Sequence, residues 1–176
     1  MLITRLLLAL VFVPMLVEAR LAASNERGQL ARGGIEPPGD VYAIMRLAYP
    51  GVFLAMIAEG YWRGSAPVVS SFVSFVIVIA GFVFFVAAKL LKWWAIVSLG
   101  DAWTFRVIVR PGVRLVATGP YRWLRHPNYV AVAGELAGVA LMSGARVAGP
   151  VGAALFGALL YKRISVEERA LEASGR

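Results

Sequence analysis

The sequence predicts an all-α, polytopic integral membrane protein with about five membrane-spanning helices. Of its 176 residues, 60% are hydrophobic and only 16% are charged, and the mean hydropathy is +0.73. Soluble domains usually carry about 25% charged residues, so this composition excludes an ordinary soluble domain. The length fits one domain, and we expect residues 1–176 to fold as a single unit.

Five apolar runs are candidates for the spans, because a membrane-spanning helix needs about 20 mostly apolar residues. The third run is the clearest, since it carries no charged residue. The last two runs are shorter and closely spaced, which predicts a helical hairpin, and we expect a short cytoplasmic helix after the last run. Four spans are the alternative count. The runs are residues 2–17, 41–62, 66–88, 129–144 and 147–161.

The segments between the runs differ in composition. Residues 24–40 are rich in Gly and Pro and are predicted to form a loop. Residues 89–100 either extend the third span or lie along the interface, since the tryptophans there resemble an aromatic belt. Residues 106–120 alternate short apolar stretches with Pro-Gly and Gly-Pro turns, which predicts a small hairpin-like excursion on the membrane surface.

The first run has an alternative interpretation as a cleaved signal peptide, with Arg5 as its basic start and residues 6–17 as its apolar part. Against this hypothesis, Glu18 and Arg20 stand where small cleavage-site residues belong. We therefore expect the first run to be retained as a span.

The basic residues predict the orientation in the membrane. Most of the 18 Lys and Arg residues fall in three segments, residues 18–40, 89–128 and 162–176. Five spans place these segments on one side, and the positive-inside rule makes that side cytoplasmic and leaves the N-terminus outside the inner cell membrane. The net charge of +8 therefore indicates anionic lipid headgroups, and no nucleic acid, as the counter-charge.

Composition also excludes several classes of site. The chain has no cysteine, which excludes disulfides, thiolate metal sites and thiol nucleophiles. It has a single histidine, His126, so we expect no metal site built from protein ligands alone. The sequence contains no Walker motif, no Gly-x-Gly-x-x-Gly fingerprint after a strand and no Gly-x-Ser-x-Gly elbow.

The densest group of polar residues surrounds His126, directly before the fourth run. Pro127 restricts His126 to an extended or turn conformation, and Asn128 is a good residue for a helix start. The imidazole is therefore expected at a helix N-terminus, where backbone N–H groups add positive potential. With Arg122 and Arg125 beside it, the site is expected to be strongly cationic and to suit a carboxylate or phosphate. The alternative is a histidine that only satisfies a backbone carbonyl at the interface.

Glu135 lies about two turns into the fourth run, about 10 Å from the helix start. An ionisable side chain at that depth is costly and indicates a functional site. Asn128 and Glu135 are seven residues apart, so they share a helix face. The alternative is a structural ion pair between Glu135 and a buried arginine such as Arg46.

Arg163, Glu167 and Glu168 form a third charged group just beyond the last run. Arg163 and Glu167 are four residues apart, and a surface ion pair at that spacing contributes only about 0.2–0.5 kcal/mol. The alternative is that Arg163 and one glutamate bind the amino-acid end of a zwitterionic ligand. The predicted topology brings this group to the same side of the membrane as His126.

These residues resemble the isoprenylcysteine carboxyl methyltransferase family, whose members are integral membrane methyltransferases that use S-adenosylmethionine without a Rossmann domain. The resemblance covers nearly the whole chain, from about residue 18 to residue 171, and implies a cofactor-binding and catalytic core at residues 94–172. The Arg-His-Pro-x-Tyr motif is fairly specific when it opens a membrane helix, although phospholipid N-methyltransferases and some sterol reductases share it. The matching residues are Arg125, His126, Pro127, Tyr129, Glu135 and the Arg-x-x-x-Glu-Glu-x-x-Leu segment at 163–171.

A bacterial branch of that family, associated with type III polyketide synthases, resembles the chain most. The branch methylates the hydroxyl of alkylpyrones or alkylresorcinols, so the resemblance implies a lipophilic acceptor and a functional link to such a synthase. The chain stops soon after Leu171, without the aromatic-rich tail of the isoprenylcysteine enzymes, and this disfavours a prenylated protein as acceptor. The segments that carry this resemblance are residues 25–42, 94–106, 111–112 and 119–129.

Carried over by position, the resemblance implies roles for individual residues. The catalytic candidates are Arg163, Glu168 and His126. The cofactor-binding candidates are His126, Pro127, Asn128, Tyr129, Glu135, Tyr121, Arg122 and Glu167. The candidates for contact with the methyl acceptor are Trp103, Arg106 and Glu36.

The expected reaction is methyl transfer from S-adenosylmethionine to an oxygen of a lipophilic acceptor, either a hydroxyl or a carboxylate. A carboxylate or acidic enol needs no base and is oriented by Arg163, whereas a less acidic phenol needs Glu168 or His126 as general base. Two alternatives stay open. One is a phospholipid N-methyltransferase, and the other is a non-catalytic lipid-binding or scaffold protein of the membrane.

Overall fold

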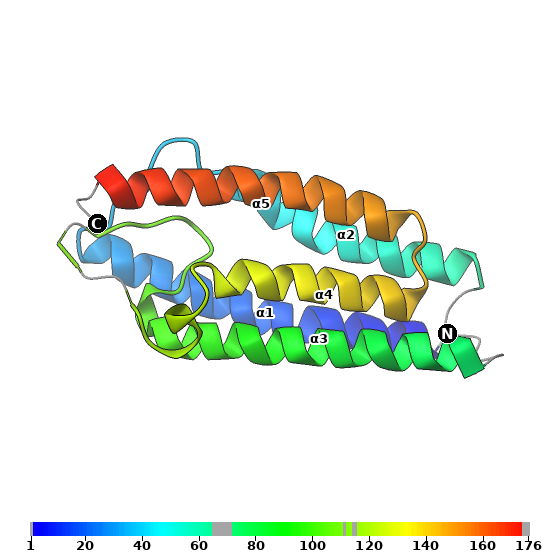
Figure 1. The fold of residues 1–176 in the computed structure, drawn as a ribbon. Coiled ribbons are helices and arrows are strands. Elements are labelled where there is room, and N and C mark those ends of the chain that lie inside the picture. The colour runs from blue at the N-terminus through cyan, green and yellow to red at the C-terminus, as the bar shows by residue number, and fades with distance from the viewer. Residues whose placement is uncertain (1, 65–71, 111, 114–115, 174–176) are drawn as a thin grey trace.

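The computed structural model describes residues 2–64, 72–110, 112–113 and 116–173. Within these residues, five α-helices alternate in direction along one axis (Figure 1). No strand occurs in the described part of the chain, so the predicted all-α class is confirmed. The helices are α1 (Leu2–Ala31), α2 (Tyr42–Trp62), α3 (Phe72–Leu99), α4 (Pro127–Ser143) and α5 (Ala148–Ala173), with short 3₁₀ turns η1 (Gly100–Ala102) and η2 (Gly119–Arg122).

Three segments are long and apolar enough to cross a membrane: α1, α2 and the continuous stretch Phe72–Ala102. α4 has 17 residues, which is at the lower limit of the usual range of about 17–25 for a span. α5 has 26 residues, and its second half is charged. The structure therefore confirms a polytopic membrane protein of five helices, and the crossing of the membrane by α4 and α5 stays a prediction.

Three helices continue beyond the predicted runs. α3 includes residues 89–99, which confirms that this segment extends the third span. α5 runs without a break to Ala173, so the prediction of a separate C-terminal helix was wrong; no Gly or Pro interrupts residues 158–173. α1 reaches Ala31, so the loop predicted from residue 24 begins later. The amide side chains of Asn25 and Gln29 find acceptors on the backbone of residues 100–103, which stabilises these polar turns of α1.

The predicted excursion at residues 106–120 forms no hairpin of its own within the described residues. Val109 instead pairs with Ile35 in an isolated antiparallel bridge, with N–O distances of 2.9 and 3.0 Å. Residues 111 and 114–115 of this segment lie outside the described part, as do residues 66–71 at the start of the predicted third span. The loop between α1 and α2 therefore braces the loop between α3 and α4.

The predicted hairpin of the last two runs is confirmed by α4 and α5. Gly144 follows α4 in a left-handed conformation, with φ of 66°, which glycine adopts without steric cost. The start of α5 is held by Glu59 of α2, whose carboxylate accepts the backbone N–H groups of Arg146, Val147 and Ala148 at 2.6–3.1 Å. This contact binds the hairpin to α2.

α3 and α4 approach each other closely at two glycines. A Cβ atom added to Gly81 would lie 2.8 Å from the carbonyl oxygen of Gly138, and one added to Gly138 would lie 2.8 Å from that of Gly81. Small residues at such contacts let helices in a membrane gain van der Waals contact between their backbones. All five helices contribute to the apolar core, whose buried side chains include Val11, Phe53, Met56, Phe85, Leu136, Val139 and Phe156.

A buried ring of four charges joins α1, α3 and α4, and we call it the lysine–glutamate ring. Lys89 lies 2.8 Å from Glu18 and 3.1 Å from Glu135. Lys92 lies 2.9 Å from Glu18 and 3.3 Å from Glu135. The hydroxyl of Tyr49 on α2 donates to Glu135, so four helices meet at these side chains. The ring contains two lysines and two glutamates, so its positive and negative side chains are equal in number.

The structural alternative for Glu135 named the wrong partner. Arg46, the expected partner, is exposed on α2. Glu135 instead pairs with Lys89 and Lys92, which are three residues apart on α3 and therefore share a face of that helix.

We expect Glu135→Leu to destabilise the bundle by about 3–5 kcal/mol, because it leaves two buried lysines with a single carboxylate. The double substitution Glu135→Leu/Lys92→Met restores the charge balance and is expected to cost less than the single one. Thermal unfolding of the detergent-solubilised protein measures both variants, with Glu172→Gln at the exposed end of α5 as the control. Equal losses for the single and double variants would contradict the importance of charge balance.

Candidate functional site

Apart from Glu135, which lies deeper along α4, the polar residues singled out in the sequence belong to segments at one end of the bundle, on the left in Figure 1. This end holds the C-terminal ends of α1, α3 and α5, the N-terminal ends of α2 and α4, and the two loops that brace each other. The described parts of the three basic segments therefore lie at the same end, as the alternating topology predicted. Which side of the membrane this end faces stays a prediction.

Arg163 on α5 is at the centre of this site, with a side chain only 6% exposed. Its Nε donates to the hydroxyl of Tyr129 at 3.0 Å. One of its terminal nitrogens donates to Asp40 at 2.7 Å, and the other donates to the carbonyl oxygen of Phe105. A guanidinium is a rigid planar fork of donors, so these three acceptors fix its orientation.

Tyr129 and His126 connect the start of α4 to the next turn of α5. The Tyr129 hydroxyl donates to Glu167 at 2.6 Å. The Nε2 atom of His126 lies 3.4 Å from Glu168, and its Nδ1 lies 3.9 Å from Glu167. The rings of His126 and Tyr129 stack with their centroids 5.4 Å apart. Arg125 reaches Glu168 from outside, at 3.6 Å.

These side chains come from the start of α4, the second half of α5 and the loop before α2, and we call them the Arg163 cluster. Its members are Asp40, Arg125, His126, Tyr129, Arg163, Glu167 and Glu168.

The backbone at the start of α4 holds His126 as the sequence predicted. His126 has φ of −131° and ψ of 64°, outside the helical region, and Pro127 is the first residue of the helix. The imidazole makes no capping hydrogen bond to the helix. Its polar contacts are to the carboxylates of Glu167 and Glu168, so the alternative of a histidine that satisfies a backbone carbonyl does not describe the contacts seen.

The balance of charge in the cluster differs from the expected one. Asp40, Glu167 and Glu168 outnumber the two arginines, whereas the sequence neighbours of His126 alone predicted a strongly cationic site. That prediction was wrong because α5 and the loop before α2 bring carboxylates to His126. Arg122 is exposed, and its guanidinium lies over the ring of Trp123, 5.5 Å from the centroid. The cluster therefore suits a cationic group when His126 is neutral.

Two further candidates flank the cluster. The Oδ1 atom of Asn128 is buried and has no hydrogen-bond partner within the described part of the chain. A buried amide oxygen of this kind costs free energy, so it is a candidate acceptor for an N–H group of a ligand. Burial raises the pKa of the Tyr121 phenol, and the negative charge of Glu167 raises it further. Tyr121 therefore stays protonated at neutral pH and is a hydrogen-bond donor, not a base.

The three acceptor-contact candidates lie in the loops between helices. Glu36 is in the loop between α1 and α2, and Trp103 and Arg106 are in the loop between α3 and α4. Trp103 is buried against Ala22 and Ile96, between α1 and α3. Arg106 binds Glu36 at 2.8 Å, and the hydrogen bond and charge of Glu36 raise the pKa of the Arg106 guanidinium. Arg106 and Glu36 thus contact each other, and their role toward an acceptor stays a prediction.

Glu135 is separated from the Arg163 cluster along α4. It shares a helix face with Asn128 but lies about two turns deeper, where its carboxylate is close to Lys89 and Lys92. Its place in a cofactor pocket stays a prediction.

Sequence reasoning missed two residues that build the site. Asp40 ends the Gly- and Pro-rich loop one residue before Val41, the N-cap of α2, and a polar residue close to a helix start is a weak signal. Glu26 of α1 accepts the backbone N–H groups of Phe105 and Arg106 at 3.1 and 3.2 Å. For the lysine–glutamate ring a signal existed, since two lysines three residues apart in an apolar helix need carboxylate partners.

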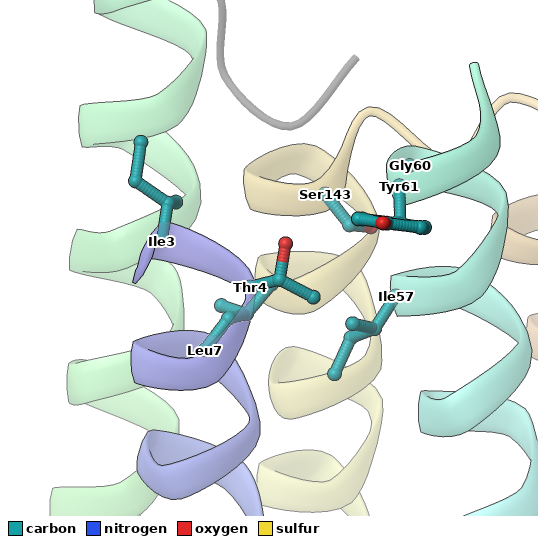
Figure 2. Close-up of a pocket in the computed structure, with 7 residues that line it drawn as sticks. All are labelled: Ile3, Thr4, Leu7, Ile57, Gly60, Tyr61 and Ser143. Atoms are coloured by element: carbon teal, nitrogen blue, oxygen red, sulfur yellow. The ribbon is translucent and has the colours of Figure 1, made fainter. Parts of the chain in front are cut away.

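A small cavity lies at the opposite end of the bundle, among α1, α2 and α4 (Figure 2). Its volume of about 10 Å³ has room for about one water molecule. The hydroxyl of Thr4 is buried there with no described partner. The cavity is lined by Ile3, Thr4, Leu7, Ile57, Gly60, Tyr61 and Ser143, and it forms no part of the candidate site.

The sequence profile of the isoprenylcysteine carboxyl methyltransferase (ICMT) family matches residues 77–173, more than half of the chain. The protein belongs to the isoprenylcysteine carboxyl methyltransferase family. The matched range contains α4 and α5 whole and every member of the Arg163 cluster except Asp40. Membership of this family points to a membrane methyltransferase.

Two relatives extend the similarity over nearly the whole chain. The uncharacterized protein YpbQ of Bacillus subtilis is 32% identical over 95% of both chains. An uncharacterized protein of Haemophilus influenzae is 24% identical over 86% of this chain and 84% of its own. Neither name states an activity, so the polyketide-associated branch stays a prediction. No solved structure matches the chain.

We expect Tyr129→Phe to destabilise the protein by about 1–3 kcal/mol, because the buried Nε of Arg163 loses its acceptor. Tyr161→Phe is the matched control on α5, since Tyr161 is 76% exposed, and it is expected to leave stability unchanged. Thermal unfolding in detergent compares the two variants. Equal melting temperatures would contradict the importance of the Tyr129 hydroxyl.

Proposed function

We propose that this protein transfers a methyl group from S-adenosylmethionine to an oxygen of a lipophilic acceptor at the Arg163 cluster. One observation carries the proposal. In a chain of a methyltransferase family, the His-Pro-Asn-Tyr start of α4 meets Arg163, Glu167 and Glu168 of α5 at one end of an apolar bundle.

The residues of the cluster fit this cofactor. Its sulfonium and amino groups are positively charged, and the cluster has an excess of carboxylates that includes Glu167 and Glu168. The unpartnered Oδ1 of Asn128 offers a buried acceptor for an N–H group. Arg125 is 86% exposed and is the cluster cation best placed for the cofactor carboxylate, because the guanidinium of Arg163 already binds three acceptors.

When bound, S-adenosylmethionine supplies an electrophilic methyl group on a positively charged sulfur atom. The side chains of the cluster bind and orient the reactants, and orientation supplies much of the rate in a displacement of this kind. Arg163 holds the Tyr129 hydroxyl, and Tyr129 in turn holds Glu167. These contacts hold the three side chains in a fixed arrangement, and preorganised groups of this kind need little reorganisation during reaction.

A hydroxyl acceptor must lose its proton as the new carbon–oxygen bond forms. His126 is suited to accept that proton, because Glu168 lies 3.4 Å from its Nε2 and stabilises the imidazolium that results. An acceptor that is already a carboxylate or an enolate needs no base. His126 therefore matters most for the less acidic acceptors.

For the acceptor, we propose the hydroxyl of a long-chain alkylpyrone or alkylresorcinol, the product of a type III polyketide synthase. The resemblance to the bacterial branch supports this choice. The bundle also exposes apolar side chains such as Trp94, Val97 and Trp123 near the same end, where a lipid with a polar head reaches the cluster from the bilayer. Trp side chains favour this interface.

We further propose that this end of the bundle faces the cytoplasm from the inner cell membrane, with the N-terminus outside. The gathering of the basic segments at one end supports this orientation through the positive-inside rule. A soluble cofactor and an insoluble acceptor meet at such a site.

In lipid vesicles with a labelled methyl donor, we expect the wild type to methylate a long-chain alkylresorcinol or alkylpyrone. Arg163→Ala is expected to lower the rate about 100-fold, because a small misplacement of orienting groups costs about that much. Lys162→Ala is the matched control, since Lys162 is the exposed neighbour of Arg163 on α5, and it is expected to keep the wild-type rate.

The choice of acceptors in the same assay separates the alternatives. Methylation of phosphatidylethanolamine alone would indicate an N-methyltransferase. Methylation of a prenylcysteine alone would show that the acceptor group is a carboxylate and not a hydroxyl. The proposal fails if no lipid gains a methyl group and calorimetry detects no binding of S-adenosylhomocysteine. A non-catalytic membrane protein would then be the better description.

We expect His126→Ala to lower methylation of a phenolic hydroxyl about 100-fold, the lower end of the usual contribution of a general base. Methylation of a lipid carboxylate, which has no proton to lose, is expected to fall much less. Rates on the two acceptors measure the difference. An equal loss on both would assign His126 to binding instead of proton transfer.

A further inference from the structure

Asp40 is a buried carboxylate that connects three segments far apart in the sequence. One oxygen accepts from the Arg163 guanidinium at 2.7 Å and from the backbone N–H of Tyr42 at 3.1 Å. The other accepts from the backbone N–H of Val107 at 2.9 Å. The Asp40 side chain is only 4% exposed, so these contacts exclude water from both oxygens.

Asp40 is one of three acceptors that orient the Arg163 guanidinium. The acceptors of the guanidinium are Asp40, the carbonyl oxygen of Phe105 and the hydroxyl of Tyr129. Only Tyr129 belongs to the motif at the start of α4. The other two acceptors lie in the loops before α2 and after α3, and together they set the plane in which Nε points at Tyr129.

The Phe105 carbonyl is itself held in place. Glu26 of α1 accepts the N–H groups on both sides of the Phe105 residue, at 3.1 Å from Phe105 and 3.2 Å from Arg106. The second of these N–H groups belongs to the same planar peptide unit as the carbonyl that Arg163 binds. Both supports of Arg163 outside α4 are therefore rigid.

A chain of hydrogen bonds connects Arg163 through Tyr129 to the Glu167 carboxylate of α5. Because Nε donates to the Tyr129 oxygen, the tyrosine directs its own proton to Glu167, 2.6 Å away. A change in the direction of Nε therefore moves the Tyr129 hydroxyl and, through it, the Glu167 carboxylate.

We infer that Asp40 is a positioning residue for methyl transfer, acting through Arg163 to fix Tyr129 and Glu167. This inference rests on the proposed function, and it extends the site to a residue that precedes the range matched by the family. Asp40 touches neither reactant. Its effect is on the rate at saturation and not on the affinity for the acceptor.

The decisive variant is Asp40→Asn, which keeps the size of the side chain and one oxygen acceptor but removes the charge that faces Arg163. We expect kcat to fall about 10- to 100-fold, as for a small misplacement of orienting groups, while KM for the lipid acceptor changes less than about threefold. Asp101→Asn is the control, because Asp101 pairs with Arg32 at 2.7 Å but is 56% exposed, and it is expected to keep the wild-type kcat.

A double-mutant cycle tests whether Asp40 acts through Arg163. Arg163→Lys keeps the charge but loses the planar fork, so we expect kcat to fall. If the two residues act as a unit, Asp40→Asn/Arg163→Lys is no slower than the slower single variant, within about twofold. A wild-type kcat for Asp40→Asn, or a double variant in which both losses multiply, would overturn the inference.

A second measurement separates this inference from the proposed function, because it needs no substrate. Melting temperatures are compared for Asp40→Asn, Tyr129→Phe and the double variant, and coupling through Arg163 predicts a combined shift smaller than the sum. Additive shifts overturn the inference whether or not the protein methylates lipids. Should Asp40→Asn not fold, Asp40→Glu replaces it: a lower kcat at unchanged KM supports the inference, and a wild-type kcat overturns it.

Discussion

A buried guanidinium must find an acceptor for its donors, and Arg163 finds its acceptors in three different parts of the chain. Asp40 comes from the loop before α2, the Phe105 carbonyl from the loop after α3, and Tyr129 from α4. The buried donors of Arg163 are therefore paired only where α5 meets both loops and α4. The candidate site is in this sense a consequence of the assembly of the whole bundle.

The bundle treats buried charge in two ways. In the lysine–glutamate ring, each of the two lysines lies within 3.3 Å of two glutamates, so positive and negative side chains are equal in number. In the Arg163 cluster, the carboxylates outnumber the arginines. Charge in a medium of low dielectric is costly unless it is paired. The ring is therefore suited to holding helices together, and the cluster to receiving a cation.

The helices of this fold were predictable where a long apolar run alone is enough to make the segment helical. In lipid, a chain must satisfy its peptide groups internally, so the apolar runs at 41–62 and 129–144 match α2 and α4 closely. The ends of α1 and α5 were not predictable in this way. Asn25 and Gly28 are weak helix formers, yet this stretch remains helical, and the backbone near η1 offers acceptors to the amide side chains of Asn25 and Gln29. These acceptors, at residues 100–103, are more than 70 positions away in the sequence.

The sequence by itself determined the membrane class, the five helices, the common end for the basic segments and the motif that places His126 before α4. These features follow from local composition and spacing. Only the tertiary structure decided the sign of charge around His126, the lysine partners of Glu135 and the part played by Asp40. Asp40 and Arg163 are 123 positions apart, and their side chains interact only because folding brings them to 2.7 Å. Electrostatic interactions depend on distance in space, which the order of residues along the chain does not specify.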